Sequence, residues 1–327
     1  MPTYVSGNKN KMGFCHLSTN CNKKSNVRTE DNLLKNVSSE FLYWFSGFTD
    51  AEGNFLISID RQYVRFRFKI SLHIDDVEVL NTIKSNLNVG TVTLESSRNR
   101  CSYIIQNYEE IINIICPIFN AFPLHTSKRL DFENFSQAIF IKDNQKLSDA
   151  GLSKIVSLKN TMNSKREIFT YNTTKSQIII NPNWFIGFIE GEGTFGIKTG
   201  SSLYFQIAQK NTSQESLNAI TTFLTGLCNN LLQNSKILPL NVTSTTNVRT
   251  DVVSLVVYSV DSLYYYLLPL LDTSKMYSRK AIDFNLWRVA LLLKIKGYYY
   301  LPEGKTLFLD ISDILNIRSV VHTSTYV

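Results

Sequence analysis

The sequence contains few of the residues that mark several common protein classes. Its cysteines are odd in number and irregularly spaced (Cys15, Cys21, Cys101, Cys116 and Cys228), which argues against a disulfide framework. The sequence has no CxxC pair of the kind that holds a structural zinc ion, and its four histidines are scattered along the chain. Any metal chemistry must therefore depend on carboxylates.

Glycine and proline are also scarce, with 14 and 7 residues in a chain of 327, which excludes collagen-like and proline-rich disordered proteins. No apolar run reaches the roughly 18–20 residues that a membrane span needs. The first residues have no apolar segment typical of a secretory signal. We therefore expect a soluble intracellular protein without a membrane partner.

The composition that remains is globular, with 43% hydrophobic and 12% aromatic residues, and the length predicts about two domains. Lysine and arginine number 34 against 27 aspartates and glutamates, for a net charge of +7. Such a surplus permits a polyanionic partner but does not identify one.

The chain contains an internal repeat. Residues 45–53 (FSGFTDAEG) match 185–193 (FIGFIEGEG) in pattern, and 68–73 (FKISLH) match 205–210 (FQIAQK). Later, KRLDF at 128–132 is echoed by KAIDF at 280–284. Three matching blocks in the same order indicate a tandem duplication.

Each copy is predicted to begin with a helix. One starts after Ser38 or Ser39, and the other after Asn181 with Pro182 in its first turn. Both should end at glycines in a left-handed cap, Gly53 and Gly193. Two strands, a helix, two strands and a helix follow, at 54–59, 64–72, 76–87, 91–95, 102–106 and 109–122 in the first copy, and at 194–198, 203–209, 213–224, 238–243, 251–258 and 262–271 in the second.

These patterns predict an α+β fold of two tandem, pseudo-symmetric αββαββα units. We expect a first domain at 37–166, a linker at 167–180, and a second domain with a C-terminal tail at 181–327. Residues 1–36 are polar and irregular, and we interpret them as an N-terminal extension.

One predicted strand has a cationic face. Residues 64–72 (VRFRFKISL) alternate strictly, so apolar side chains face a core while Arg65, Arg67 and Lys69 face outward. Adjacent like charges favour an anionic partner, although an ordinary solvated face explains the charge alone. Candidate DNA-contacting residues are Asn54, Ser58, Arg61, Arg65, Arg67, Lys69, Arg98 and Arg100 in the first copy, and Lys198, Tyr204, Gln206, Lys236 and Arg249 in the second. Because the two sets differ, a duplicated reader implies an asymmetric target.

Acidic residues lie at the unfavourable end of both motif helices. Glu52 and Glu192 each precede the terminal glycine, where the helix dipole disfavours a carboxylate unless a cation is near. Glycines in mid-helix, Gly47 and Gly187, cost roughly 0.5–1 kcal/mol each and permit close packing of the two helices. That packing would pair the acids. Paired carboxylates beside a polyanion-binding sheet suit metal-dependent phosphodiester hydrolysis, whereas exposed helix ends of an ordinary repeat protein are the alternative.

Both nine-residue strings resemble the LAGLIDADG motif, and residues 38–300 resemble the single-chain, two-motif homing endonucleases encoded in organellar introns. The resemblance implies two saddle-shaped antiparallel sheets, packed through the motif helices of a monomer. It also implies a divalent-metal-dependent DNA endonuclease that makes a double-strand break in a long, asymmetric target, with one motif serving each strand.

The resemblance also assigns residues. Glu52 and Glu192 would hold two or more Mg²⁺ (or Mn²⁺) ions shared by the two motifs. The remaining implied site residues are the backbone oxygens of Ala51 and Gly191 as ligands, Lys128 and Lys280 beside the scissile phosphate, and Lys69 and Gln206 near the attacking water. Lys275 remains an alternative to Lys280, because TSK at 126–128 also matches TSK at 273–275.

Two other functions fit the same surface. An intron RNA maturase would bind host intron RNA, alone or in addition to cleaving DNA, and a catalytically inactive protein would only bind DNA. The intact acids of both motifs favour cleavage. The resemblance places the protein in the mitochondrion, although residues 1–36 lack the amphipathic arginine pattern of a transit peptide.

Overall fold

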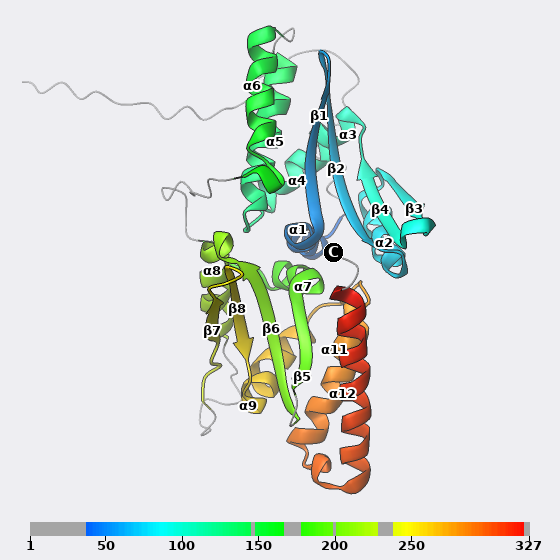
Figure 1. Ribbon diagram of the computed structural model, residues 1–327, viewed down its shortest axis with the longest axis vertical. Helices are drawn as coiled ribbons and strands as arrows, with labels where there is room; N and C mark the ends of the chain where they lie inside the picture. The colour runs from blue at the N-terminus through cyan, green and yellow to red at the C-terminus, as the bar shows by residue number, and fades with distance from the viewer. Residues whose placement is uncertain (1–36, 145–147, 167–177, 199–200, 228–237, 324–327) are drawn as a thin grey trace, which may run out of the picture.

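The computed structural model describes residues 37–144, 148–166, 178–198, 201–227 and 238–323. Two units of the same design lie one above the other and meet at two central helices (Figure 1). The predicted extension at 1–36, most of the linker at 167–180, and Lys236 lie outside the described residues. The domain boundaries therefore stay a prediction.

The first unit contains two hairpins joined by a helix and followed by further helices. Its elements are α1 (Ser39–Glu52), β1 (Gly53–Asp60), β2 (Tyr63–His73), α2 (Val77–Leu87), β3 (Thr91–Glu95), β4 (Arg100–Ile105), α3 (Tyr108–Glu110), α4 (Cys116–Ala121), α5 (Lys128–Asn144) and α6 (Asp149–Asn160).

The second unit repeats this order. Its elements are α7 (Pro182–Glu192), β5 (Gly193–Lys198), β6 (Ser202–Lys210), α8 (Gln214–Thr225), β7 (Thr243–Asn247), β8 (Val252–Val257), α9 (Val260–Ser262), α10 (Leu268–Leu271), α11 (Lys280–Ile295) and α12 (Pro302–Thr323).

Each unit has one four-stranded antiparallel sheet, in the order β1-β2-β4-β3 or β5-β6-β8-β7. Asn54 pairs with Lys69 in the first sheet, and Thr194 pairs with Gln206 in the second. The predicted α+β fold of two equivalent units is confirmed. No helix among the described residues is long and apolar enough to cross a membrane.

The inner face of each sheet packs on aromatic side chains. Phe66, Phe68 and Ile70 of β2 are at most 3% exposed, as the alternation predicts. In the first unit Phe55 lies 5.3–5.6 Å, between ring centroids, from four other phenylalanines that include Phe135. The sheets therefore present only their opposite faces to solvent or a partner.

The motif helices begin as the sequence predicts. The Ser38 side chain accepts a hydrogen bond from the Phe41 backbone N–H, and that of Asn181 accepts one from the Asn183 N–H. Pro182 occupies the first turn of α7, where its missing N–H costs nothing. Capping side chains thus fix the start of both helices.

The predicted left-handed glycine caps are wrong. Gly53 has φ −74° and ψ 157°, and Gly193 has φ −80° and ψ 147°, which is extended backbone. Each helix continues directly into a strand, so the chain must become extended at this residue. Glycine is still needed, because a Cβ would lie 2.7 Å from the Thr49 carbonyl oxygen or 2.6 Å from that of Ile189.

The two motif helices cross at their mid-helix glycines. A Cβ on Gly47 would lie 1.9 Å from the Trp184 carbonyl oxygen, and one on Gly187 would lie 2.0 Å from that of Trp44. Backbone meets backbone here, so neither position has room for a side chain. This crossing sets how the two units face each other (Figure 1).

Two strand predictions need correction. The strand expected at 238–243 is wrong, since β7 spans Thr243–Asn247 and pairs with Val252–Val257. Every residue of β7 is polar and exposed, so no alternation of apolar residues marks this strand in the sequence. In the first unit, β4 begins at Arg100 rather than at residue 102.

Candidate active site and nucleic-acid interface

Glu52 and Glu192 end α1 and α7, and the helix crossing brings these ends together. A Cβ at Gly191 would lie 2.9 Å from Glu52 Oε1, so the acid of one helix lies against the last turn of the other. Burial raises the pKa of Glu52 to about 7, and the nearby Glu192 carboxylate adds to the rise. Burial also raises the pKa of Glu192. Two carboxylates whose negative charge is disfavoured form a site that a cation would stabilise.

Asp50, two residues before Glu52, anchors a turn instead of facing the other acids. Its carboxylate accepts the backbone N–H of His125 at 2.7 Å and that of Thr126 at 3.1 Å. It also accepts the indole N–H of Trp184, on the other motif helix, at 3.0 Å. Asp50 thus ties together α1, α7 and the turn that leads into α5.

Glu190 makes the equivalent contacts in the second unit. Its carboxylate accepts the backbone N–H groups of Tyr277 at 2.9 Å and Ser278 at 2.6 Å. The indole N–H of Trp44 donates to it at 2.6 Å. The two networks are related by the pseudo-symmetry, so they identify which turn of one unit corresponds to which turn of the other.

This correspondence favours one of the two candidate lysines of the second unit. The Lys128 backbone N–H donates to Thr126 Oγ1, and the Lys280 backbone N–H donates to Ser278 Oγ, both at 3.3 Å. Lys280 therefore occupies the position of Lys128, at the start of a helix beside an anchored turn. Lys275 lies before that turn and is exposed, with its Nζ 5.3 Å from the Tyr277 ring centroid.

Both lysines are half-buried beside the acids. Burial lowers the pKa of Lys128, while Glu52 is the largest of the charges that oppose this shift. Burial lowers the pKa of Lys280 as well, and Asp283 is the largest opposing charge. Two ammonium groups, one from each unit, thus accompany two carboxylates.

The main-chain oxygen of Ala51 already has a partner. Lys128 Nζ donates to it at 2.7 Å and to the Thr49 carbonyl oxygen at 3.3 Å. A carbonyl oxygen has a second lone pair, so this contact leaves acceptor capacity for an ion. No group of three or more His, Cys, Asp or Glu side chains gathers in the described part of the chain. A metal site here would therefore combine the two acids, main-chain oxygens and substrate oxygens.

A cleft of about 500 Å³ opens beside Glu52. Lys128, Asn54 and Lys69 are among its lining residues, so the outward face of the first sheet continues directly to the acids. Glu52 also lines a smaller cavity of about 90 Å³, together with Asp76, Arg279 and Lys280.

No sequence pattern predicts the ion cluster beside that smaller cavity. The Arg279 backbone N–H donates to Asp76 Oδ1 at 3.0 Å, and its guanidinium contacts Asp76 at 3.2 Å and Asp75 at 2.6 Å. Because Arg279 immediately precedes Lys280, these bonds hold the start of α11 in the second unit against the first unit. Only the folded arrangement brings these residues together.

The sequence also does not predict a role for Gln209. It hydrogen-bonds Glu192 and thereby lowers the pKa that burial raises. In the aligned blocks FKISLH and FQIAQK its counterpart is Leu72, which lines the cavity beside Glu52. Gln206, predicted to lie near the attacking water, occupies the strand position equivalent to Lys69 and donates from Nε2 to Ser254 Oγ at 3.3 Å.

The candidate DNA-contacting residues differ in placement between the units. Asn54, Ser58, Arg65 and Arg67 are exposed on the outward face of the first sheet, and Lys69 is half-buried there. Arg61 lies at the tip of the first hairpin, while Arg98 pairs with Glu95 at 3.8 Å, and Arg100 begins β4. In the second unit Tyr204 and Gln206 lie on the outward face, Lys198 Nζ donates to the Tyr258 hydroxyl at 2.9 Å, and Arg249 is exposed in the turn after β7.

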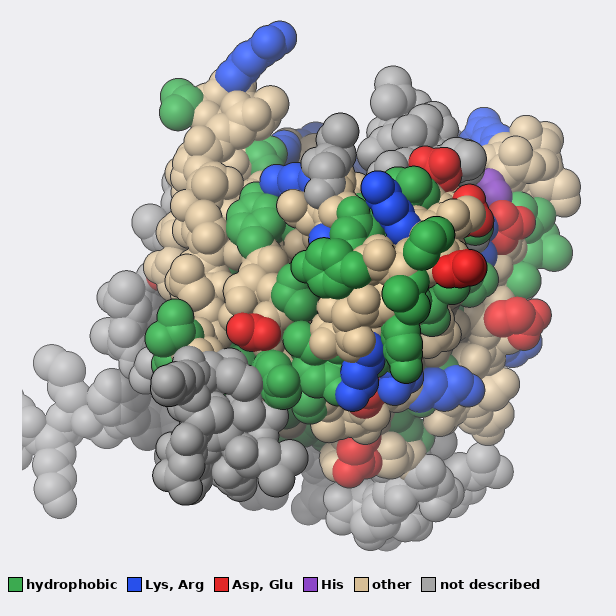
Figure 2. All heavy atoms as spheres, turned by 90° about the horizontal axis from the view of Figure 1, so that it is seen from below, with side chains coloured by type: hydrophobic (Ala, Val, Ile, Leu, Met, Phe, Trp, Pro, Cys, Tyr) green, Lys and Arg blue, Asp and Glu red, His purple; other side chains and the backbone are tan. Residues whose placement is uncertain are grey.

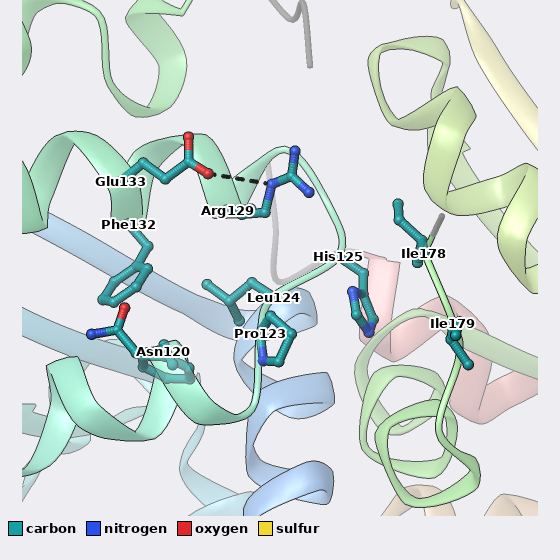
Figure 3. Close-up of a pocket in the computed structure, with 10 residues that line it drawn as sticks. Asn120, Pro123, Leu124, His125, Arg129, Phe132, Glu133, Ile178 and Ile179 are labelled. Carbon is teal, nitrogen blue, oxygen red and sulfur yellow. Dashed lines mark ion pairs between the residues drawn. The ribbon is translucent and has the colours of Figure 1, made fainter. Parts of the chain in front are cut away.

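The structure has a further cavity, of about 450 Å³, that contains none of the predicted site residues. Figure 3 shows His125, Leu124 and Pro123 facing Ile178 and Ile179, with the Arg129–Glu133 ion pair at 3.5 Å beyond them. Its lining has one acid, which is already paired, so it lacks the carboxylate pair that defines the site at the helix crossing.

Among the described residues, the end of the second unit shows no continuous basic surface. Figure 2 shows it from below, with hydrophobic side chains in the middle and both signs of charge scattered around them. Tyr298, Tyr300 and Leu301 are exposed large hydrophobic residues of this unit. The concentrated cationic row is instead the outward face of β2.

Comparison with protein families gives one matching description. The model of the family described as LAGLIDADG endonuclease matches residues 45–139 and 185–291, which include both motifs, both sheets and both lysine-bearing turns. Together these segments amount to more than half of the chain.

Curated relatives come from fungi. The chain is 28% identical over 326 residues to the uncharacterized mitochondrial protein RF1 of Saccharomyces cerevisiae, covering 96% of this chain and 66% of the relative. It is 32% identical over 195 residues to the probable intron-encoded endonuclease Cox1-I1b of Schizosaccharomyces pombe, covering 56% and 49%. A probable intron-encoded endonuclease 2 of Neurospora crassa is 33% identical over 142 residues, covering 42% and 31%. The chain thus spans between about a third and two thirds of these relatives.

Solved structures share the fold. The I-LtrWI LAGLIDADG homing endonuclease bound to target DNA superposes with a TM-score of 0.71 at 20% identity, over 84% of this chain and 97% of that one. I-SmaMI bound to uncleaved DNA target in the presence of calcium ions gives 0.68 at 21% identity, over 84% and 98%.

Proposed function

The chain belongs to the LAGLIDADG endonuclease family, and from that premise we propose that it is a homing endonuclease that cuts both strands of a long, asymmetric DNA target. The observation that carries the proposal is the pair of acids at the crossing of α1 and α7. Glu52 and Glu192 lie half-buried together there, with Lys128 from one unit and Lys280 from the other.

The acids fit a divalent cation, because burial and mutual repulsion disfavour their charge in its absence. Glu52 and Glu192, with the main-chain oxygens of Ala51 and Gly191, would hold Mg²⁺ or Mn²⁺, in two or more ions shared by the motifs. When bound, the metal supplies a water of lowered pKa and neutralises charge on the reacting phosphate.

The chain's own residues supply the remaining electrostatics. Lys128 and Lys280 place ammonium groups where negative charge increases on a phosphate, and their burial makes that interaction stronger than it would be in water. Gln209, beside Glu192, favours the charged form of that carboxyl and lowers its pKa against the effect of burial. Lys69 lines the cleft beside Glu52 and would contact the water that attacks one of the DNA strands.

The outward sheet faces would bind the duplex. In the first sheet, Arg65, Arg67 and Lys69 form a cationic row that begins at the active-site cleft. Neutralising phosphates with such side chains releases counterions, so affinity should fall with salt. A solved relative, I-SmaMI, is described as bound to its DNA target, which supports double-stranded DNA as the partner of a monomer.

The maturase alternative is not favoured. Several curated relatives are called intron-encoded endonucleases, and the solved neighbours are described with DNA. Because a relative is a mitochondrial protein of yeast, we propose the mitochondrion as the location.

The test uses a duplex that spans the gene's own insertion point with the insert removed. Wild-type protein should cut both strands in Mg²⁺ and bind without cutting in Ca²⁺. The double variant Glu52→Gln/Glu192→Gln should bind equally well and leave the duplex intact. Cutting by the double variant, or binding without cutting by the wild type in every divalent metal, would contradict the proposal.

A further inference from the structure

The two outward sheet faces can be compared residue by residue, because their strand registers are equivalent. Asn54 pairs with Lys69 as Thr194 pairs with Gln206. Counting along the second strand of each sheet, the equivalent outward residues are Arg65 and Ser202, Arg67 and Tyr204, Lys69 and Gln206, and Ser71 and Ala208. Three cations of β2 are thus replaced by neutral side chains in β6.

On β4 and β3 the second unit lacks a cation at one position only, at the start of β4, where Arg100 corresponds to Val252 of β8. Ser102 of β4 corresponds to Ser254 of β8, and the outward threonines of β3, Thr91 and Thr93, correspond to Thr243 and Thr245 of β7. Most of the cations that the second face lacks therefore lie on β2, between β1 and β4.

The second face is apolar and hydroxyl-rich. Lys198 and Lys210 are the only charged outward residues on the four strands β5 to β8, which the structure describes completely, and they lie at strand ends. Between them the Tyr204 ring covers Gly196, where a Cβ would lie 2.3 Å from the ring carbon Cζ. Gly196 therefore makes room for an aromatic ring that lies flat on the sheet. Val256, which pairs with Gln206 on the same face, is only 2% exposed.

Resting on the proposed function, we propose that the two halves of the DNA target differ in base composition. The half of the target that the first unit binds has guanines where β2 enters the major groove. The half that the second unit binds is A·T-rich where β6 enters the major groove. The argument follows from what each face offers to base edges.

A guanine offers two acceptors, O6 and N7, in the major groove, and an arginine or lysine that donates to both is the commonest specific contact. Arg67 lies in the middle of β2, between β1 and β4, and its guanidinium also donates to Gln106 Oε1 at 3.1 Å. That bond orients the donor group over the sheet. Glutamine, threonine, alanine and aromatic side chains instead suit adenine edges and the thymine methyl group, and these are the residue types around Tyr204 and Gln206.

The experiment selects sites from a randomised duplex library with the full chain in Ca²⁺. The expected pool has guanines on one side of its centre and A·T pairs on the other. Arg67→Gln should remove a guanine preference on the guanine side alone and weaken binding to the wild-type site about tenfold. The matched variant Tyr204→Arg should add a guanine preference on the A·T side alone.

The outcomes separate the two proposals. Equal guanine content in both halves, or a selected pool that Arg67→Gln leaves unchanged, would overturn this inference and leave sequence-specific DNA binding intact. A pool with no enriched sequence would overturn both. Circular dichroism of each variant establishes that it is folded before its pool is compared.

Discussion

The surroundings of Glu52 disfavour the charged form of its carboxyl group in the metal-free protein. Its side chain is half-buried beside a second carboxylate, and the loss of solvent around it raises its pKa to about 7. A general anion-binding or structural role would not need such an arrangement, whereas cation binding does. The free-energy cost of the site should therefore appear in the stability of the metal-free protein.

The first prediction concerns pH. Between the ordinary carboxyl pKa and about 7, folded Glu52 keeps a proton that the unfolded chain releases, so the unfolding free energy should fall as pH rises through this range. Denaturant unfolding in EDTA from pH 5 to 8 measures the slope. Glu52→Gln should have a shallower slope than wild type, and equal slopes would contradict the burial of an ionisable group here.

The second prediction separates the two candidate lysines. Lys280→Ala should lower the rate of cleavage about 100-fold or more, because it removes a buried charge beside the reacting phosphate. Lys275→Ala should stay within about twofold of wild type, as expected of an exposed side chain. Single-turnover cleavage at saturating protein measures both. A larger loss in Lys275→Ala would exchange the two assignments.

At the residue scale, the sequence predicts the site residues that occur in both copies of the repeat. It does not predict the site residues that occur in only one copy. Glu52 and Glu192 stand out because the same costly placement occurs twice. Gln209 has leucine as its counterpart, and Arg279 has Ser127, so neither is repeated. Their contacts with Glu192 and Asp76 depend on a turn and a helix start from different parts of the chain.

At the scale of elements, the crossing of α1 and α7 determines the geometry of the site. Gly47 and Gly187 let the two backbones touch, and Asp50 and Glu190 then bind the turns that carry the lysines. The helix crossing and the lysine turns are therefore one connected structure. A change at the crossing should move all four catalytic candidates.

The third prediction tests that crossing. Gly47→Ala should destabilise the protein by at least about 2 kcal/mol, because its methyl group would overlap the Trp184 carbonyl, which cannot move independently of α7. Gly226→Ala is the control at a helix end with an ordinary φ of −82°, where a Cβ would lie 3.1 Å from the Thr222 carbonyl oxygen and need only a small shift, and it should change stability by less than about 1 kcal/mol. Urea unfolding measures both. Equal stabilities would mean that the helices do not pack this closely.

Elements with an amphipathic pattern were predictable, and elements without one were not. The alternation in β2 locates the strand and its buried face. The β7 strand, TSTTN, is exposed on every residue, so only its pairing with β8 defines it. The glycines that end both motif helices were located correctly, but their conformation depends on the strand that follows.

At the scale of the whole molecule, duplication has produced two similar units with one shared site. Each unit contributes an acid and a lysine, so neither is expected to cut DNA by itself. The sheets have diverged more than the site has, as the replacement of Arg67 by Tyr204 illustrates. A duplicated enzyme of this kind can keep its chemistry while the two halves of its target change separately.

The most direct test of this account is strand-resolved, single-turnover cleavage of the intron-free duplex in Mg²⁺ by Glu52→Gln and Glu192→Gln separately. The account predicts that each single change abolishes double-strand breaks, lowering cleavage of at least one strand about 100-fold or more, with binding retained. Double-strand breaks at the wild-type rate in either variant would contradict a site that needs both acids.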